Sequence, residues 1–281
     1  MKMHVLIENT TKSELVAEHG LSIFIEYNDK KILLDAGTTS TFIDNAKKMD
    51  VDISVADFCV LSHGHYDHSG GFAEYLRQNP RKKVYAMETI VDEYYSASGG
   101  EIHPIGVPED VYPVYKDNFI LLNQITKLAE GIYVIPHKKI ERLSKIGERA
   151  KLYKKIDDEY RPDDFSHELS LVFDTEAGLV IFNSCSHSGI VNIIDEVKEY
   201  FGQGKEVAAF IGGLHMKGKS GEKEICTFSE NEIEEMTKYL EKNSVKKLYT
   251  GHCTGMVGYE LIKKYIGEKV EYIYTGRELT I

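Results

Sequence analysis

An apolar run at residues 58–61 leads directly into Ser-His-Gly-His-Tyr-Asp-His-Ser-Gly-Gly at residues 62–71. Three histidines and one aspartate therefore fall within six residues, where a strand-like segment becomes a glycine-flanked loop. His63 and His65 are two positions apart, so in an extended chain both side chains face the same side. Asp67 and His68 follow on a turn. Imidazole and carboxylate groups are ligands of zinc, iron and manganese ions, and the run therefore predicts a metal site.

The chemistry that such a site supports is hydrolysis. His63 and His65 could face one divalent ion, and Asp67 and His68 could reach a second. A bound ion with an open coordination position lowers the pKa of its water toward about 7, which supplies hydroxide at neutral pH. Asp67 could also act catalytically by accepting a proton from that water. The motif Gly-x-Ser-x-Gly is absent from the sequence, so we expect a metal-dependent hydrolase that uses metal-activated hydroxide.

Composition narrows the environment and the partners. A net charge of −11 argues against a general nucleic-acid binder, because phosphate neutralisation needs an excess of lysine and arginine. The four cysteines have no Cys-x-x-Cys spacing, which favours a reducing compartment over a disulfide framework. No apolar run is long enough to span a membrane, and the N-terminal residues lack the pattern of a secretory signal. We expect a cytoplasmic protein with a small-molecule substrate, and the sequence leaves the oligomeric state open.

Strand-like and helical segments alternate in both halves of the chain. Helical character is found at residues 41–49, 70–78, 190–201 and 231–242. Short apolar runs lie between them, which is typical of a layered α/β fold in a single domain spanning residues 1–281. Residues 88–166 differ, because tyrosines and phenylalanine are scattered among glycines and prolines there. We interpret this stretch as an insertion that forms a lid over the scaffold.

A two-ion site needs further ligands from later strand ends. His252 follows a strand-like run at residues 247–249. Cys185 and His187 follow another at residues 179–183, and their spacing lets both face the same side. His167 lies beside the start of a third run and competes with His187 for one role, in which we favour His187. A Cys185 thiolate could bridge two ions, but it would favour softer metals and be open to oxidation.

Two further features are candidates for substrate binding. His215 follows a pair of glycines and could contact substrate, although a buried structural histidine explains it equally well. Residues 138–155 hold eight basic side chains, of which Arg142 and Arg149 could bind phosphate or another anion. The alternative for this basic run is a solvated helix face. The other histidines are interpreted as structural or solvent-facing: His4, His19, His103 and His137.

The run His-x-His-x-Asp-His at residues 63–68 matches the signature of the metallo-β-lactamase superfamily. Leu34-Asp35-Ala36-Gly37 resembles the strand-end motif that precedes it in that superfamily. The resemblance implies a four-layer αβ/βα sandwich with the metal site at one edge, between two β-sheets. It also implies that His252 completes the ion held by Asp67 and His68, and that Asp35 supports the ligands from behind. Where the superfamily has a bridging aspartate, this chain offers Asn183, Cys185 and His187.

A finer resemblance is to the branch labelled dihydropterin-ribofuranosylaminobenzene-phosphate synthase-like. Residues 19–22, 61–71, 183–190 and 212–215 carry it. It implies an anionic substrate such as a phosphoester or phosphodiester-like small molecule, and one or two divalent ions, with zinc expected and iron or manganese as alternatives. Two other functions remain open. One is a pterin-linked synthase acting on a ribofuranosylaminobenzene phosphate, and the other is a non-hydrolytic iron-binding redox or sensor protein.

Overall fold

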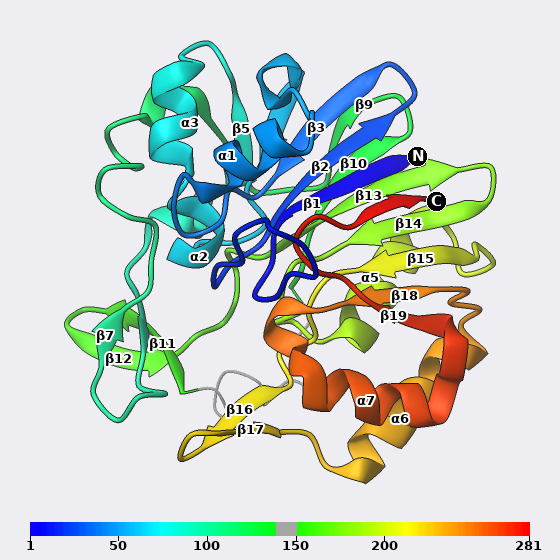
Figure 1. The fold of residues 1–281 in the computed structure, drawn as a ribbon. Coiled ribbons are helices and arrows are strands. Elements are labelled where there is room, and N and C mark those ends of the chain that lie inside the picture. The colour runs from blue at the N-terminus through cyan, green and yellow to red at the C-terminus, as the bar shows by residue number, and fades with distance from the viewer. Residues whose placement is uncertain (139–150) are drawn as a thin grey trace.

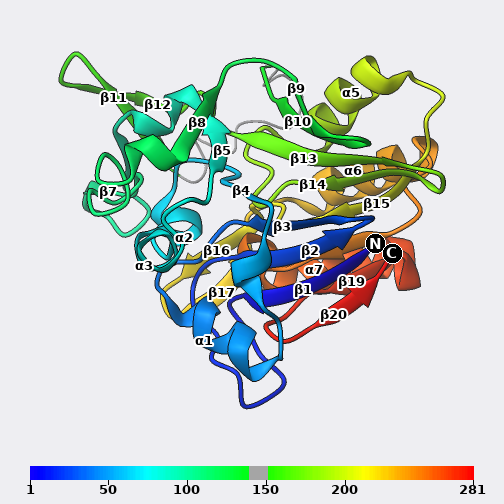
Figure 2. The same cartoon turned by 90° about the horizontal axis from the view of Figure 1, so that it is seen from above.

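The computed structural model describes residues 1–138 and 151–281, and two seven-stranded sheets face each other within it. The first sheet runs in the order β20 (Glu278–Thr280), β1 (Lys2–Ile7), β2 (Ser22–Tyr27), β3 (Lys30–Leu34), β4 (Phe58–Val60), β5 (Val84–Met87) and β8 (Phe119–Leu122). The second runs in the order β19 (Val270–Tyr272), β18 (Leu248–Thr250), β15 (Val207–Ile211), β14 (Gly178–Phe182), β13 (Leu169–Thr175), β10 (Ile132–Pro136) and β9 (Thr126–Ala129). Figure 2 shows the two sheets stacked face to face.

Helices cover the outer faces of both sheets (Figures 1 and 2). The helices α1 (Thr41–Lys48) and α3 (Phe72–Gln78) lie beside the first sheet, and α5 (Ile190–Phe201), α6 (Glu230–Lys242) and α7 (Gly255–Ile266) lie beside the second. Among the described residues, no helix is long and apolar enough to cross a membrane. The layers are therefore helix, sheet, sheet and helix, which confirms the four-layer αβ/βα sandwich.

Side-chain alternation explains why the second sheet is buried on both faces. In β13, Leu171 and Phe173 pack into the cluster between the sheets, whereas Val172 packs toward the helices. The helix α5 presents Ile193, Ile194 and other apolar side chains to that outer cluster. Strands buried on both faces read as continuous apolar runs, and this is the pattern of residues 179–182 in β14.

The segment predicted as one continuous insertion, residues 88–166, is divided in the structure. The strands β8, β9 and β10 complete the two main sheets, so the predicted range is wrong for residues 119–136. The physical reason is that Phe119, Ile132 and Val134 are buried in the core between the sheets. Other described parts of the range form a separate four-stranded sheet: β12 (Glu159–Pro162), β11 (Leu152–Ile156), β6 (Tyr94–Ser96) and β7 (His103–Pro104).

The candidate site lies where several strands end. The strands β3 and β4 are parallel to each other, and so are β14, β15 and β18. Carboxyl ends of parallel strands meet at one edge of a sheet. The loops after these strands carry residues 35–37, 61–71, 183–189, 212–215 and 251–254, which include most of the predicted ligands.

Candidate metal centre

The first histidines of the loop after β4 direct free nitrogens into the protein. The Nδ1 atom of His63 lies 2.8 Å from Ser62 Oγ, so its Nε2 atom faces the other way. The Nε2 atoms of His63 and His65 are buried, and no hydrogen-bond partner is present for them among the described residues. Burial and neighbouring imidazoles lower the pKa of His63 well below its ordinary value, and burial lowers that of His65 to about 3. Both rings are therefore neutral at neutral pH.

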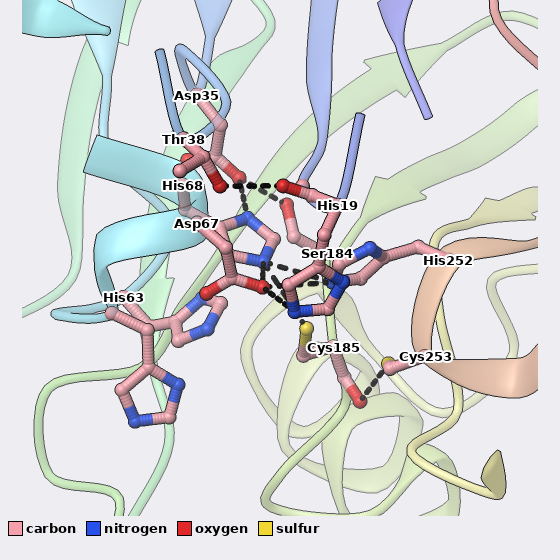
Figure 3. Close-up of polar contacts among 12 residues, drawn as sticks. His19, Asp35, Thr38, His63, Asp67, His68, Ser184, Cys185, His252 and Cys253 are labelled. Atoms are coloured by element: carbon pink, nitrogen blue, oxygen red, sulfur yellow. Dashed lines mark hydrogen bonds and ion pairs between the residues drawn. The ribbon is translucent and has the colours of Figure 1, made fainter. Parts of the chain in front are cut away.

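Asp35 holds His68 from behind (Figure 3). Its buried carboxylate accepts hydrogen bonds from the Ser62 N–H at 2.7 Å, the Ser62 hydroxyl at 2.7 Å and the Ser184 hydroxyl at 2.6 Å. Asp35 Oδ2 lies 2.7 Å from His68 Nδ1. A carboxylate on one ring nitrogen orients an imidazole and leaves the other nitrogen free for a metal ion. Asp35 thus contacts the His68 ring, and its role in supporting a metal ligand stays a prediction of the family resemblance.

His167 and His187 differ in what their ring nitrogens contact. The Gly64 N–H donates to His167 Nδ1 at 2.9 Å, so this nitrogen is an acceptor. His167 Nε2 lies 3.1 Å from Asp163 Oδ2, to which it donates in the neutral ring. Both nitrogens of His187, by contrast, are buried without a partner in the described part of the chain. Ligand atoms of His63, His65 and His187 all lie within 4.8 Å of one another, and so do those of His65, Asp163 and His167. The unpartnered ring nitrogens favour His187, because each ring nitrogen of His167 already has a partner.

The loop that carries His187 is fixed by its surroundings. Glu168 accepts hydrogen bonds from the His187 N–H at 2.7 Å and the Ser188 N–H at 2.8 Å. The ring of Phe165 stacks on His187 at 4.7 Å between centroids. Burial and the neighbouring His215 lower the pKa of His187 well below its ordinary value, which leaves a third neutral imidazole beside His63 and His65.

We expect His187→Ala to weaken metal binding more than His167→Ala does. Replacing a residue that only supports a ligand costs about 10–100-fold in metal affinity. His167 contacts the Gly64 backbone, so His167→Ala should weaken metal binding by no more than this. The loss of affinity in His187→Ala, which removes a direct ligand, should be larger. Competition with a chromophoric chelator measures both affinities. If His187→Ala binds metal like the unmodified protein while His167→Ala does not, the assignment is reversed.

A second group of ligand atoms lies beside the first. His252 Nε2 is 3.4 Å from Asp67 Oδ2 and 3.2 Å from His68 Nε2. The Asn9 side chain and the Glu8 carboxylate hold His252, with Asn9 Oδ1 2.9 Å from its Nδ1 and Glu8 Oε1 accepting from its N–H at 2.5 Å. Burial would lower the pKa of His252, but the Asp67 carboxylate outweighs it and raises that pKa to about 9. This pairing keeps Asp67, His68 and His252 together.

His19 was missed by the sequence analysis, which treated it as structural or solvent-facing. Its Nε2 atom lies 3.3 Å from Asp67 Oδ2, and its ring stacks on His252 at 5.4 Å between centroids. Gly20 makes this approach possible, because a Cβ there would lie 2.4 Å from the Asp67 carbonyl oxygen. The available signal was the stretch at residues 19–22 that resembles the synthase-like branch.

Two thiols complete the surroundings (Figure 3). Cys185 Sγ lies 3.4 Å from His68 Nε2, and Cys253 Sγ lies 3.6 Å from the Cys185 carbonyl oxygen. Burial raises the pKa of the Cys185 thiol well above its ordinary value. Cys253 was also missed as a site residue, although its position directly after His252 was a signal for it.

The donor set fits a divalent metal ion. Buried polar atoms without partners are rare because their desolvation is not compensated, yet the imidazole nitrogens of three neighbouring histidines are in this condition. Neutral imidazoles and a carboxylate are the ligands that zinc, iron and manganese accept. Binding of a cation would compensate each of these nitrogens.

These pKa shifts predict how the stability of the metal-free protein depends on pH. Histidines of the unfolded chain bind protons near pH 6.5, whereas His63, His65 and His187 in the folded chain do so only at much lower pH. Acidification below about pH 6.5 therefore favours unfolding, by up to about 1.4 kcal/mol per pH unit for each proton. His252 has the opposite sign: its pKa of about 9 contributes stability that is fully present below about pH 6.5 and lost as pH rises through 9. We expect a stability maximum near about pH 6.5.

Urea unfolding of the chelator-treated protein between roughly pH 5 and 9 measures this dependence. His187→Ala removes one of the histidines whose pKa is lowered, so its stability should fall less steeply on the acidic side. Stability that does not change over this range, or equal acid slopes in the two proteins, would contradict the expectation.

A cleft of about 840 Å³ opens beside the metal-ligand groups. His19, His215 and Cys253 line it and connect it to those groups. His215 lies 4.5 Å from His187 between ring centroids, and its Nδ1 is buried without a partner among the described residues. Its place in the wall agrees with contact to substrate. A smaller hollow of about 380 Å³ between α1 and α3 contains none of the predicted ligands.

The lining of the cleft is basic in the part of the chain that the structure describes. Lys151, Lys217 and Lys219 line it, and no carboxylate does. Lys217 Nζ lies 3.7 Å from Glu224 Oε2. Arg142 and Arg149, the sequence-based candidates for anion binding, lie outside the described residues.

Residues 213–220 contain the pattern Gly-x-x-x-x-Gly-Lys-Ser, which in P-loop proteins cradles nucleotide phosphates. A P-loop requires a helix directly after the glycine-rich turn. In this chain the pattern runs instead into the hairpin of β16 (Lys217–Ser220) and β17 (Lys223–Cys226). The match is therefore not a P-loop, although two of its lysines line the cleft.

Comparisons with known proteins agree with this architecture. The family model described as the metallo-β-lactamase superfamily matches residues 15–139. A solved structure of a metal-dependent hydrolase of the β-lactamase superfamily has a TM-score of 0.82 and 26% identity, covering 100% of this chain and 99% of the other. The chain thus resembles the metallo-β-lactamase superfamily, in sequence over residues 15–139 and in fold over its whole length. Members of the superfamily bind divalent metals, and zinc-bound PqqB from Methylobacterium extorquens shares the fold, with a TM-score of 0.59 at 12% identity over 100% of both chains.

Among relatives in the superfamily, one matches almost the whole chain in sequence. It is the 7,8-dihydropterin-6-methyl-4-(β-D-ribofuranosyl)-aminobenzene-5'-phosphate synthase of Methanocaldococcus jannaschii. The two are 28% identical over 99% of this chain and 95% of the relative. The similarity agrees with the branch to which the sequence motifs pointed.

Proposed function

We propose that this protein is a metallo-β-lactamase superfamily member that hydrolyses a phosphoester or phosphodiester-like small molecule with the help of one or two divalent ions, zinc above all. The observation that carries the proposal is a set of buried imidazole nitrogens without partners, those of His63, His65 and His187, next to Asp67 and a basic cleft. Iron or manganese would suit the same ligands.

Each side chain has a part in this proposal. His63, His65 and His187 would hold one ion, and Asp67, His68 and His252 the other. When bound, such ions supply Lewis acidity that activates water and polarises a phosphoryl group. Asp67 can accept a proton from water, and His19 contacts Asp67 Oδ2 from the cleft side. His19 therefore positions the catalytic carboxylate.

The basic lining supports an anionic substrate. Lys217 and Lys219 lie on one strand of the β16–β17 hairpin, and Lys151 lies beside the small sheet. A phosphoryl group in the cleft would meet cations from two separate elements, with His215 between them and the metal-ligand groups. Charge-assisted hydrogen bonds of this kind position phosphate groups.

We expect the double variant Lys217→Gln/Lys219→Gln to raise KM for a phosphorylated substrate at least about tenfold, because each hydrogen bond to a charged group contributes about 1.5–3 kcal/mol. If these lysines bind substrate and transition state equally, kcat stays unchanged. The matched control is Lys238→Gln/Lys242→Gln on the exposed face of α6. Equal KM values for both double variants would remove the argument for an anionic substrate from these lysines. Arg142→Gln/Arg149→Gln tests the sequence-based candidates in the same assay.

One experiment tests the proposed function as a whole. Chelator-treated protein is reloaded with zinc, manganese or iron and assayed on a panel of phosphomonoesters and phosphodiesters. The proposal expects turnover that depends on the added metal and is lost on chelation. Metal-loaded protein that binds stoichiometric ion but turns over no member of the panel would contradict it.

A pterin-linked synthase is the second candidate, because the similarity to the synthase extends over 99% of this chain. The two candidates differ in the products formed. Incubation with a dihydropterin precursor and a ribofuranosylaminobenzene phosphate, followed by mass spectrometry, would detect a joined product only for a synthase. Metal analysis also separates both from an iron-binding redox protein, whose visible spectrum should change on reduction.

A further inference from the structure

Two cysteines from different strand ends meet at the second group of ligand atoms. Cys185 follows β14 and Cys253 follows β18, and these strands are both paired with β15. The ligand atoms of Cys185, His252 and Cys253 all lie within 4.8 Å of one another. Figure 3 shows both sulfur atoms on the side of this group that faces the β14 loop. A thiol pair beside a histidine has the ligand types of a zinc or iron site.

Cys185 also lies close to His63, a member of the first group. Its sulfur lies within 4.8 Å of the ligand atoms of His63 and His68, so Cys185 is common to two sets of potential ligands. Cys185 is buried, whereas Cys253 is partly exposed and lines the cleft. Cys185 thus lies between the two sets of potential ligands, and Cys253 lies on the side that faces the cleft.

The backbone around the two sulfurs is fixed by close contacts. The Gly213 N–H donates to the Ser184 carbonyl oxygen at 2.8 Å, and the Ser184 hydroxyl is bound to Asp35. A Cβ at position 213 would lie 2.4 Å from Cys253 Sγ, so glycine leaves the room that this sulfur occupies. The His215 N–H donates to Cys253 Sγ at 3.3 Å. A backbone hydrogen bond to sulfur stabilises negative charge on a thiolate.

We propose that Cys185 and Cys253 are thiolate ligands of the second metal position, together with His252, and that this position therefore selects a thiophilic divalent ion. Cys185 also lies close to His63 of the first position. The inference rests on the metal centre of the proposed function and adds to it the class of ion. Zinc, iron(II), cobalt(II) and cadmium accept thiolates, whereas magnesium and calcium prefer oxygen ligands. Each bound thiol releases its proton when the metal binds.

Cobalt(II) tests this assignment by spectroscopy, independently of catalysis. Its weak visible bands report that an ion is bound, and thiolate–cobalt charge transfer absorbs strongly in the near ultraviolet. We expect the cobalt-loaded protein to show both. Cys253→Ser should lower the charge-transfer absorbance per protein by about half, since one of two thiolates is lost, and Cys185→Ser/Cys253→Ser should abolish it. Cys226→Ser is the matched control and should leave it unchanged, because this half-buried thiol of β17 lies outside the ligand groups.

A second measurement needs no variant that could misfold. Iodoacetamide labelling followed by mass spectrometry compares Cys253 with Cys226 in metal-free and cobalt-loaded protein. We expect cobalt to slow alkylation of Cys253 at least about tenfold, because the thiolate is the nucleophile and is engaged by the ion, and to leave Cys226 unaffected. Visible bands without charge transfer, or unprotected Cys253 in loaded protein, would overturn the thiolate assignment and leave the proposed hydrolase intact. Absence of bound cobalt altogether would instead contradict the metal centre itself.

Discussion

His65→Ala is expected to lose bound metal and hydrolytic activity together. His65 shares its group with His63 and His187, and its buried Nε2 has no partner among the described residues. Removing one of three imidazoles leaves too few ligands for a stable first position. Because loss of even an indirect support costs about 10–100-fold in affinity, loss of a ligand should exceed 100-fold. Metal content after gel filtration and kcat/KM on the best substrate of the panel measure the two effects.

The matched control for this prediction is His137→Ala. His137 is also a buried histidine, but its ring nitrogens contact Glu196 at 2.8 Å and Ser170 at 2.7 Å. The His137→Ala variant should have a lower free energy of unfolding and an unchanged metal content. A His65→Ala protein that is folded and retains its full metal content would show that His65 is not a ligand.

Asp35→Ala is expected to have the largest effect on stability. The Asp35 side chain is fully buried and accepts from Ser62 and Ser184 while it contacts His68. Alanine would leave these donors buried without an acceptor, and each such group costs about 1–3 kcal/mol. We expect a loss of about 3–5 kcal/mol in the free energy of unfolding, as when one partner of a buried charged pair is removed. Urea denaturation of metal-free protein measures it.

The same variant should also weaken the second metal position, because His68 would lose the carboxylate that orients its ring. The expected loss in affinity there is about 10–100-fold. Asp52→Ala is the control, since this aspartate is exposed and accepts from Ser54 at the start of a short helical turn. Equal stability and equal metal binding in the two variants would mean that Asp35 has no supporting role.

Sequence reasoning needed no tertiary contact where the candidate ligands are close together in the chain. His63 to His68 were recognisable because local spacing alone brings them to one loop, and Asp35 because it ends a buried strand. The layered fold was likewise predictable, since alternation between strand-like and helical segments reflects which side chains each layer buries. The extent of the insertion, by contrast, could not be predicted from the sequence. Residues 119–136 continue the two main sheets through pairing with β5 and β13, and pairing between distant strands leaves no local signal.

The sequence by itself therefore determined the layered architecture, and it predicted the candidate metal-binding loop and the strand ends that carry the further candidate ligands. Only the tertiary structure decided which side chains at those ends turn toward the loop. His167 and His187 both lie beside strands, but both ring nitrogens of His167 have partners, Nδ1 in the Gly64 N–H, 103 positions away, and Nε2 in Asp163. His19 and Cys253, which no local pattern marked as ligands, join the site through contacts between distant segments. Glycines at positions 20 and 213 permit contacts between segments that no local pattern relates, and such contacts exist only once the two sheets have packed together.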